Sequence, residues 1–350
     1  MKIPLGLSFD DVLLVPQRSE VNSRSEIDLT SEIAPGFFLK IPIIATKMET
    51  VTGIEMAIAM SKAGGLALMH RFDTAEKEAD NIAAVKKAGE RVFATVGARD
   101  DFLARAQTSV KAGADGLVFD VANGHLAKAI KATAALKNKF PKLPLLAGIV
   151  STYDGAYRLF AAGADTVMVG IGAGAICTTR IMTGCGVPQI TSLVDCVRAA
   201  KKFKKKFIIP DAGVKNSGDV VKALATGASA VICGSLMAGT NEAPGELIEH
   251  EGRLYKKYEG STSPSQKKKE QEKTGVTMAH FLYHVEGVEG LIPYKGPTAE
   301  WLNYICAGVR SGFSYCGAKN IKQLWKKAKF IQITSAGMAE SQAHTIIRIS

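Results

Sequence analysis

The chain has 350 residues, 47% of them hydrophobic, and a formal net charge of +11 at pH 7. This length allows a large core in one barrel-sized domain or in two smaller ones. No apolar run reaches the ~18 residues of a membrane span, and Met1–Asp11 lacks the pattern of a signal peptide. Composition therefore excludes an integral membrane protein of the helical type and indicates no membrane partner.

The six cysteines form no C-x-x-C pair, which favours reduced thiols and a cytoplasmic location. Much of the positive charge lies in the lysine-rich segments 201–206, 267–273 and 326–329. Because no nucleic-acid-binding module accompanies these segments, we expect no nucleic-acid partner. A phosphate-bearing small molecule accounts for part of the charge more simply.

Short apolar runs alternate with segments of helical periodicity over the first two thirds of the chain. Continuous apolar strands indicate burial on both faces, as in parallel sheets, and eight such βα units predict a TIM (β/α)8 barrel. The predicted strands are Ile41–Met48, Leu66–His70, Val92–Ala98, Gly116–Val121, Leu143–Val150, Thr166–Ile171, Phe207–Gly213 and Ala230–Ser235. The predicted helices are Gly53–Ala63, Thr74–Ala88, Phe102–Ala112, His125–Lys139, Tyr153–Ala162, Ile190–Lys202 and Ser217–Ala225.

The pattern breaks between about Glu242 and Gly296, where the sequence is polar, charged and glycine-containing. We interpret residues 1–350 as a single barrel domain with a mobile flap inserted at about 242–296 and a C-terminal extension at about 319–350. Within the flap, Lys267–Thr274 is rich in Ser, Lys, Gln and Glu, and is expected to be either a disordered surface loop or a lid over the site.

Chemically versatile residues follow the predicted strands, and a TIM barrel places its active site at the carboxyl ends of its strands. We therefore expect these residues to share one rim. They are Lys47–Glu49, His70, Arg71, Asp120–Asn123, Gly148–Val150, Cys177, Asp211–Gly213, Gly234 and Ser235.

The most informative of these segments is the loop Gly172–Arg180, which follows an apolar strand. Its glycines allow a tight turn and close approach to a ligand. Its cysteine, Cys177, is a potential nucleophile, with hydroxyl and cationic side chains directly after it. The alternative is a glycine-rich turn that holds an inert thiol.

Several segments together resemble the IMP dehydrogenase/GMP reductase family over nearly the whole length of the chain. The Cys-Thr-Thr-Arg loop that ends in Gly-Val-Pro-Gln is the most specific of them. The segments are Leu7–Pro16, Met48–Thr52, Gly172–Gln189, Gly234–Gly245, Tyr294–Gly296, Arg310–Ser311 and Tyr315–Ala318.

The resemblance implies a shared chemistry in which the thiolate of Cys177 adds to C2 of a purine nucleotide. It gives Thr179 a proton-relay role and Glu286 the task of setting the acidity of that threonine, although Glu289 lies close enough to be the aligned residue instead. It implies that Asp211 accepts hydrogen bonds from the ribose. Substrate phosphate and base contacts are implied for Ala175, Ala212, Gly213, Gly234, Ser235, Tyr258 and Gly260.

The resemblance also implies a nicotinamide cofactor, a potassium ion and a homotetramer. Cofactor-binding positions would be Ser23, Arg24, Asp120, Val121, Ala122, Arg310 and Ser311. The backbone of Gly172, Gly174 and Cys177 would hold K⁺, together with a neighbouring subunit's tail near Glu340. The resemblance suggests no CBS regulatory domain, since the chain passes directly from His70 to Val92.

Three features favour GMP reductase, which uses NADPH, over IMP dehydrogenase, which uses NAD. They are the Ser23–Leu29 segment, the Asp120–Gly124 segment, and a flap without the Arg-Tyr pair by which dehydrogenases activate water. A guanidinium at Arg24 suits the additional phosphate of NADPH. Two other segments, Glu286–Gly290 and the tail Ala336–Ser341, resemble the corresponding segments of bacterial IMP dehydrogenases instead.

At some positions the residue differs from the one that is usual in both GMP reductases and IMP dehydrogenases. Ala175 replaces a serine, which removes a hydrogen bond of about 0.5–1.5 kcal/mol to the phosphate. Ala212 replaces a glycine, a small change if its φ is negative. Ile149, Lys47 and Ser261 are also unusual for the family. Ala175, Ile149 and Ser261 together suggest a second class of function, a nucleotide-binding protein that has lost turnover.

Overall fold

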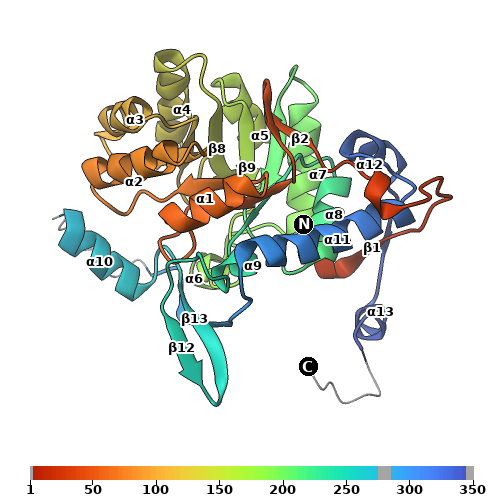
Figure 1. Ribbon diagram of the computed structural model, residues 1–350. Coiled ribbons are helices and arrows are strands. Elements are labelled where there is room, and N and C mark those ends of the chain that lie inside the picture. The colour runs from red at the N-terminus through yellow and green to blue at the C-terminus, as the bar shows by residue number, and fades with distance from the viewer. Residues whose placement is uncertain (1–2, 275–284, 344–350) are drawn as a thin grey trace.

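The computed structural model describes residues 3–274 and 285–343, and its centre is a barrel of eight parallel strands (Figure 1). Their order around the barrel follows the sequence, and a parallel bridge between Asp211 and Ile232 joins the last strand pair. The TIM barrel is thus confirmed, with strands up to three residues shorter at either end than predicted. The strands are β4 (Ile43–Ala45), β5 (Leu66–Met69), β6 (Phe93–Val96), β7 (Gly116–Asp120), β8 (Leu145–Val150), β9 (Thr166–Val169), β10 (Phe207–Pro210) and β11 (Val231–Cys233).

Helices surround the barrel, and the seven predicted ones begin and end within two residues of the predicted positions. The helix that follows the eighth strand and the flap, α11 (Thr298–Tyr315), packs against α8 and α1 and was not predicted. The others are α1 (Ile54–Lys62), α2 (Ala75–Lys87), α3 (Phe102–Lys111), α4 (Ala127–Lys139), α5 (Tyr153–Ala161), α7 (Gln189–Ala200) and α8 (Ser217–Ala225).

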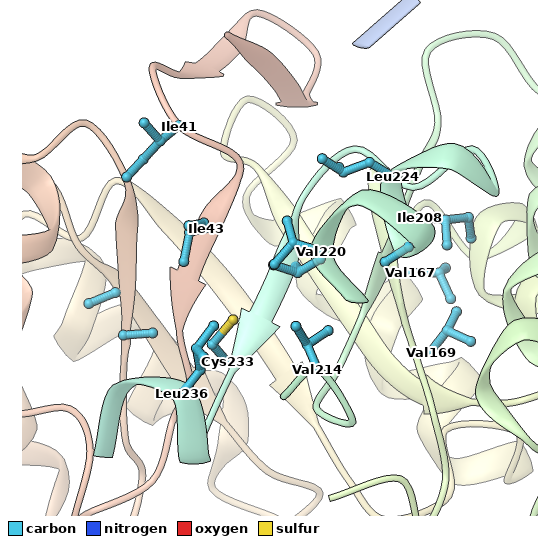
Figure 2. Close-up of a cluster of buried hydrophobic side chains, with 14 of the residues drawn as sticks. Ile41, Ile43, Val167, Val169, Ile208, Val214, Val220, Leu224, Cys233 and Leu236 are labelled. Carbon is cyan, nitrogen blue, oxygen red and sulfur yellow. The ribbon is translucent and has the colours of Figure 1, made fainter. Parts of the chain in front are cut away.

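The core has two layers because successive strand residues point to opposite faces of the sheet. In β9, Met168 lies in the cluster inside the barrel, whereas Val167 and Val169 belong to the cluster between strands and helices. Figure 2 shows this outer cluster, in which Val220 and Leu224 of α8 lie near strand side chains. The hairpin of β2 (Ser31–Ala34) and β3 (Phe37–Leu39) adds Ile33 and Leu39 to the inner cluster and so covers one end of the barrel. The other end is left for the site.

The flap forms a three-stranded antiparallel sheet, β12 (Leu247–His250), β13 (Arg253–Glu259) and β14 (Glu289–Pro293), together with α10 (Pro264–Thr274). The expectation of a disordered loop over 267–274 is wrong. Helix α10 has no apolar face and is joined to the barrel by ion pairs instead. Its Glu270 pairs with Arg99, and Nζ of its Lys273 lies 2.8 Å from the carboxylate of Asp73. A helix with no hydrophobic stripe therefore docks through charges on the barrel.

Short elements complete the chain. Strand β1 (Val12–Leu14) pairs with β15 (Phe330–Gln332), which ties the two ends of the chain together. No helix in the described residues is long and apolar enough to cross a bilayer. The remaining helices are η1 (Phe9–Asp11), η2 (Arg24–Glu26), α6 (Thr179–Thr183), α9 (Ser235–Ala238), α12 (Ile321–Lys327) and α13 (Ser335–Glu340).

Candidate active site

The loop after β9 carries Cys177 at the end of the barrel where the flap lies (Figure 1). The flap holds this loop in place: Cys177 forms an antiparallel bridge with Gly287, and the backbone N–H of Thr178 donates to the carbonyl oxygen of Glu286 at 2.8 Å. Cys177 is half-buried. The thiol is thus fixed by two segments that lie more than a hundred residues apart in the sequence.

A chain of hydrogen bonds leads away from the thiol. Its sulfur lies 3.1 Å from Oγ1 of Thr179, and that hydroxyl donates to Oε2 of Glu286 at 2.6 Å. A threonine hydroxyl has one hydrogen, so while it donates to Glu286 it can accept from the thiol. Glu289 instead lies on β14, where it is exposed, with its carboxylate 3.9 Å from Nζ of Lys257. The carboxylate that contacts Thr179 is therefore that of Glu286.

A cavity beside Cys177, called the main cavity below, is lined by most of the predicted site residues. It is lined by residues from the strand ends, from the Cys177 loop and from the flap. Its predicted members are Asp120, Ala122, Gly172, Gly174, Cys177, Thr179, Asp211, Ala212, Gly234, Tyr258, Gly260 and Glu286.

A second cavity adjoins the main one, since Ala173 lines both. It contains the predicted substrate residues Ala175, Gly213 and Ser235, which the main cavity does not. Two cations, Arg180 and Lys215, also line it; Nζ of Lys215 lies 2.6 Å from Asp10. Sequence analysis did not assign a role to Lys215, although it lies only two residues after the Asp211–Gly213 segment.

Tyr258 reaches into the main cavity from β13 and passes close to the backbone of Gly234. A Cβ at position 234 would lie 2.5 Å from the phenolic oxygen, so a larger residue there would displace the tyrosine hydroxyl. The hydroxyl contacts Sδ of Met48 at 3.7 Å. Burial raises the pKa of Tyr258, which keeps the phenol a neutral hydrogen-bond donor.

Ala212 adopts a left-handed conformation with φ of 72°, contrary to the negative value that would make its replacement of glycine harmless. Its N–H donates to the carbonyl oxygen of Ile232 at 3.1 Å, where β10 and β11 close the barrel. The closure of the barrel therefore imposes a conformation that costs an L-residue about 1–2 kcal/mol.

Lys47 lies buried between two predicted ligand-binding carboxylates. Its Nζ is 3.2 Å from Oδ1 of Asp120 and also contacts Oδ2 of Asp211. Burial alone would lower the pKa of Lys47, but the two carboxylates outweigh it and hold the pKa above its ordinary value. Burial raises the pKa of Asp211 in spite of the contact with Lys47. Sequence analysis noted Lys47 as unusual but gave it no partner.

The other predicted cofactor residues lie away from the main cavity. Arg24 belongs to η2 and Ser23 caps it, while Arg310 and Ser311 belong to α11, against which η2 packs. None of these four lines the main cavity, and neither does Val121.

The candidate potassium ligands Gly172, Gly174 and Cys177 share one loop, in which the Gly174 carbonyl oxygen accepts from the Cys177 N–H at 3.1 Å. The loop thus already uses one of the three carbonyl groups in an internal hydrogen bond.

With the geometry established, comparison with known proteins shows what the chain resembles. A profile of the IMP dehydrogenase/GMP reductase domain matches residues 6–344. The chain belongs to the IMP dehydrogenase/GMP reductase family. This family comprises oxidoreductases that act on purine nucleotides with a nicotinamide cofactor, and the matched domain contains no CBS regulatory domain.

Individual relatives carry both names of the family. Inosine-5′-monophosphate dehydrogenases from Nitrosopumilus maritimus and Aquifex aeolicus are each 33% identical, with 99% of this chain and 100% or 96% of the relative aligned. The crystal structure of a Trypanosoma brucei GMP reductase in complex with guanosine 5′-monophosphate has a TM-score of 0.93 at 26% identity, covering 99% of each chain.

Proposed function

We propose that the protein is a GMP reductase, which converts GMP to IMP and ammonia with NADPH. The observation that carries the proposal is the hydrogen-bonded series from Cys177 through Thr179 to Glu286 at the edge of the main cavity. Such a series can move a proton between the thiol, a departing amine and a carboxylate.

The nucleotide would occupy both cavities. Asp211 would accept from the ribose hydroxyls, and Tyr258 would donate from the flap. The second cavity would receive the phosphate among the backbone of Gly213 and Ser235, with Arg180 and Lys215 as cations. Because Ala175 has no hydroxyl, phosphate affinity would depend more on these cations.

Catalysis would begin when Cys177 loses its proton through Thr179 to Glu286, and the thiolate sulfur bonds to C2 of the purine. Return of the proton along the same path to the 2-amino group would let ammonia leave. When bound, NADPH would supply the hydride that C2 then accepts, and cleavage of the carbon–sulfur bond would restore the thiolate and release IMP. Asp120 fits the cofactor's nicotinamide ribose, since it lines the same cavity as Cys177.

The direction of the reaction is inferred from the flap. The flap contains no Arg-Tyr pair, and residues 260–290 contain no arginine, so this segment offers no guanidinium to activate water for a dehydrogenase reaction. The segment Asp120–Gly124 supports the same direction. IMP dehydrogenase, the oxidation of IMP to XMP with NAD, is the second candidate because the curated relatives carry that name.

A single assay that crosses both nucleotides with both dinucleotides tests the proposal. Purified protein should oxidise NADPH when GMP is present and release ammonia. Formation of NADH from IMP and NAD, with no reaction of GMP and NADPH, would establish the dehydrogenase instead. Binding of either nucleotide without any redox change would favour a protein that has lost turnover.

The remaining parts of the proposal follow the family. We propose a cytoplasmic homotetramer in which K⁺ lies at the carbonyl groups of Gly172, Gly174 and Cys177. Light scattering of the purified protein and assays with K⁺ replaced by Na⁺ test these two points separately.

A further inference from the structure

The main cavity holds a buried cation that the proposed reaction does not use. Lys47 follows β4, Asp120 ends β7 and Asp211 follows β10, so three strands around the barrel bring one ammonium and two carboxylates together. The side chains of Lys47, Asp211 and Asp120 are 8%, 11% and 16% exposed. At that burial, an unpaired charge is costly.

We propose that Lys47 is a positioning residue that joins Asp120 and Asp211 into one ionised unit, and that nucleotide binding at Asp211 depends on it. The inference rests on the proposed function, because it takes Asp211 as the substrate ribose acceptor and Asp120 as the cofactor ribose acceptor. A ribose hydroxyl needs an acceptor oxygen, and only the ionised carboxylate presents acceptors at both oxygens.

Both carboxylates contact the same ammonium, and the charge of Asp120 raises the pKa of Asp211. Two buried like charges that share one site do not both stay ionised once the cation between them is removed, and one takes up a proton. Arg71 does not replace Lys47, since its Nε lies 3.9 Å from Oδ2 of Asp120 and, in the described residues, it forms no ion pair with Asp211. The charged groups that act on the Asp211 carboxyl are Lys47 and Asp120, and the nearby acids Tyr258 and Cys233 offer no cation.

The ammonium also retains donor capacity. It has three N–H groups, of which two serve the carboxylates. Within the described residues, the third N–H of Lys47 has only the sulfur of Met168 nearby, 3.9 Å from Nζ, and a thioether sulfur is a weak acceptor. Ile149 lines the same cavity and supplies no polar atom from its side chain. A ligand oxygen bound near Lys47 in the main cavity would therefore accept a hydrogen bond from its ammonium group.

The test compares Lys47→Met, Lys47→Arg and the double variant Lys47→Met/Asp120→Asn with the parent protein. Lys137→Met is the matched control, because Lys137 is also ion-paired, 2.6 Å from Asp165, but does not line the main cavity. Thermal denaturation without ligand, and calorimetric titration with GMP and IMP, are measured between about pH 6 and 9, where a buried carboxyl group can titrate.

In the ligand-free measurement, Lys47→Met should lose melting temperature as pH rises, relative to the parent and the control. The sign follows from linkage: a carboxyl group whose pKa is raised in the folded state is most stable when protonated, and stability is lost as pH rises through that pKa. In the titration, Lys47→Met should bind GMP about tenfold more weakly per pH unit below the pKa of the carboxyl pair.

Lys47→Arg should behave like the parent, and the double variant should lose GMP affinity at a lower pH than Lys47→Met does, because the like charge of Asp120 is gone while Asp211 stays buried. Equal pH profiles of Lys47→Met and the parent, in stability and in affinity, would overturn the inference. If Lys47→Met does not fold, a folded double variant supports charge balance between Lys47 and the two carboxylates, and an equally unfolded double variant overturns the inference. If the parent binds neither nucleotide, the proposed function fails, while the melting profiles still decide whether Lys47 holds the pair.

Discussion

Replacement of Thr179 by valine tests the relay most directly, because it keeps the shape of the side chain and removes only the hydroxyl. The change deletes the 3.1 Å contact with Cys177 and the 2.6 Å hydrogen bond to Glu286. A neutral hydrogen bond contributes about 0.5–1.5 kcal/mol and one to a charged group about 1.5–3 kcal/mol. Together these give about 2–4.5 kcal/mol, or about a 30- to 2,000-fold lower kcat if both act in the transition state.

The assay follows NADPH oxidation with GMP and reports kcat and KM separately. Thr179→Val should lower kcat in the stated range and leave KM for GMP within about threefold, since the hydroxyl acts on the reacting groups rather than on the ribose or phosphate. Glu286→Gln should have a similar effect, and the double variant should be little worse than either single one, because residues of one relay are not additive. The rate of thiol alkylation should fall in the same variants.

Thr178→Val is the matched control, since it makes the same change one residue before the relay, at a side chain that does not line the main cavity. It should leave kcat nearly unchanged. A fall of less than about tenfold in kcat for Thr179→Val, together with a raised KM, would show that the hydroxyl positions substrate and does not carry the proton.

Three further predictions concern other parts of the site. Cys177→Ala should abolish turnover while GMP affinity, measured by calorimetry, stays within a few-fold; residual turnover would show that no covalent adduct is needed. Ala212→Gly should raise the free energy of unfolding by about 1 kcal/mol because it relieves the left-handed conformation, and unchanged or lower stability in denaturant titration would contradict this. Glu259 has a pKa lowered to about 2, since hydrogen bonds from Lys257, Lys269 and Gln266 overcome the effect of its burial. Its stabilisation is present above pH 4.5 and lost as pH falls towards about 2, so the melting temperature of Glu259→Gln should fall less than that of the parent over this range.

The barrel was predictable because its signal is local. Apolar runs and helical periodicity repeat along the chain, and burial on both faces of each strand follows from them. The sequence did not predict α10, because periodicity detects an apolar face and this helix is held by ion pairs such as Arg99–Glu270 and Lys273–Asp73. It did not predict α11 as the last helix of the barrel, because the flap lies in the sequence between this helix and the eighth strand, β11.

Prediction of the site was limited by distance along the chain. Family motifs predicted Cys177 and Asp211 as site residues, and both line the main cavity, but spacing along the sequence does not reveal which side chains from different strands are in contact. The contacts of Lys47 with Asp120 and Asp211 arise only from barrel closure. The same closure determines the left-handed φ at position 212, which residue type alone would not suggest.

The position of Glu286 links the flap to the chemistry. Gly287 and Val288, which follow it, pair with the Cys177 loop: the N–H of Val288 donates to the carbonyl oxygen of Ile176 at 3.0 Å. The flap therefore brings the carboxylate to Thr179 and at the same time holds the loop that carries the thiol. A flap that moved away would break the 2.6 Å hydrogen bond and these backbone pairings together. Because one segment makes both sets of contacts, the hydrogen-bonded series from Cys177 to Glu286 is complete only when the flap lies over the barrel.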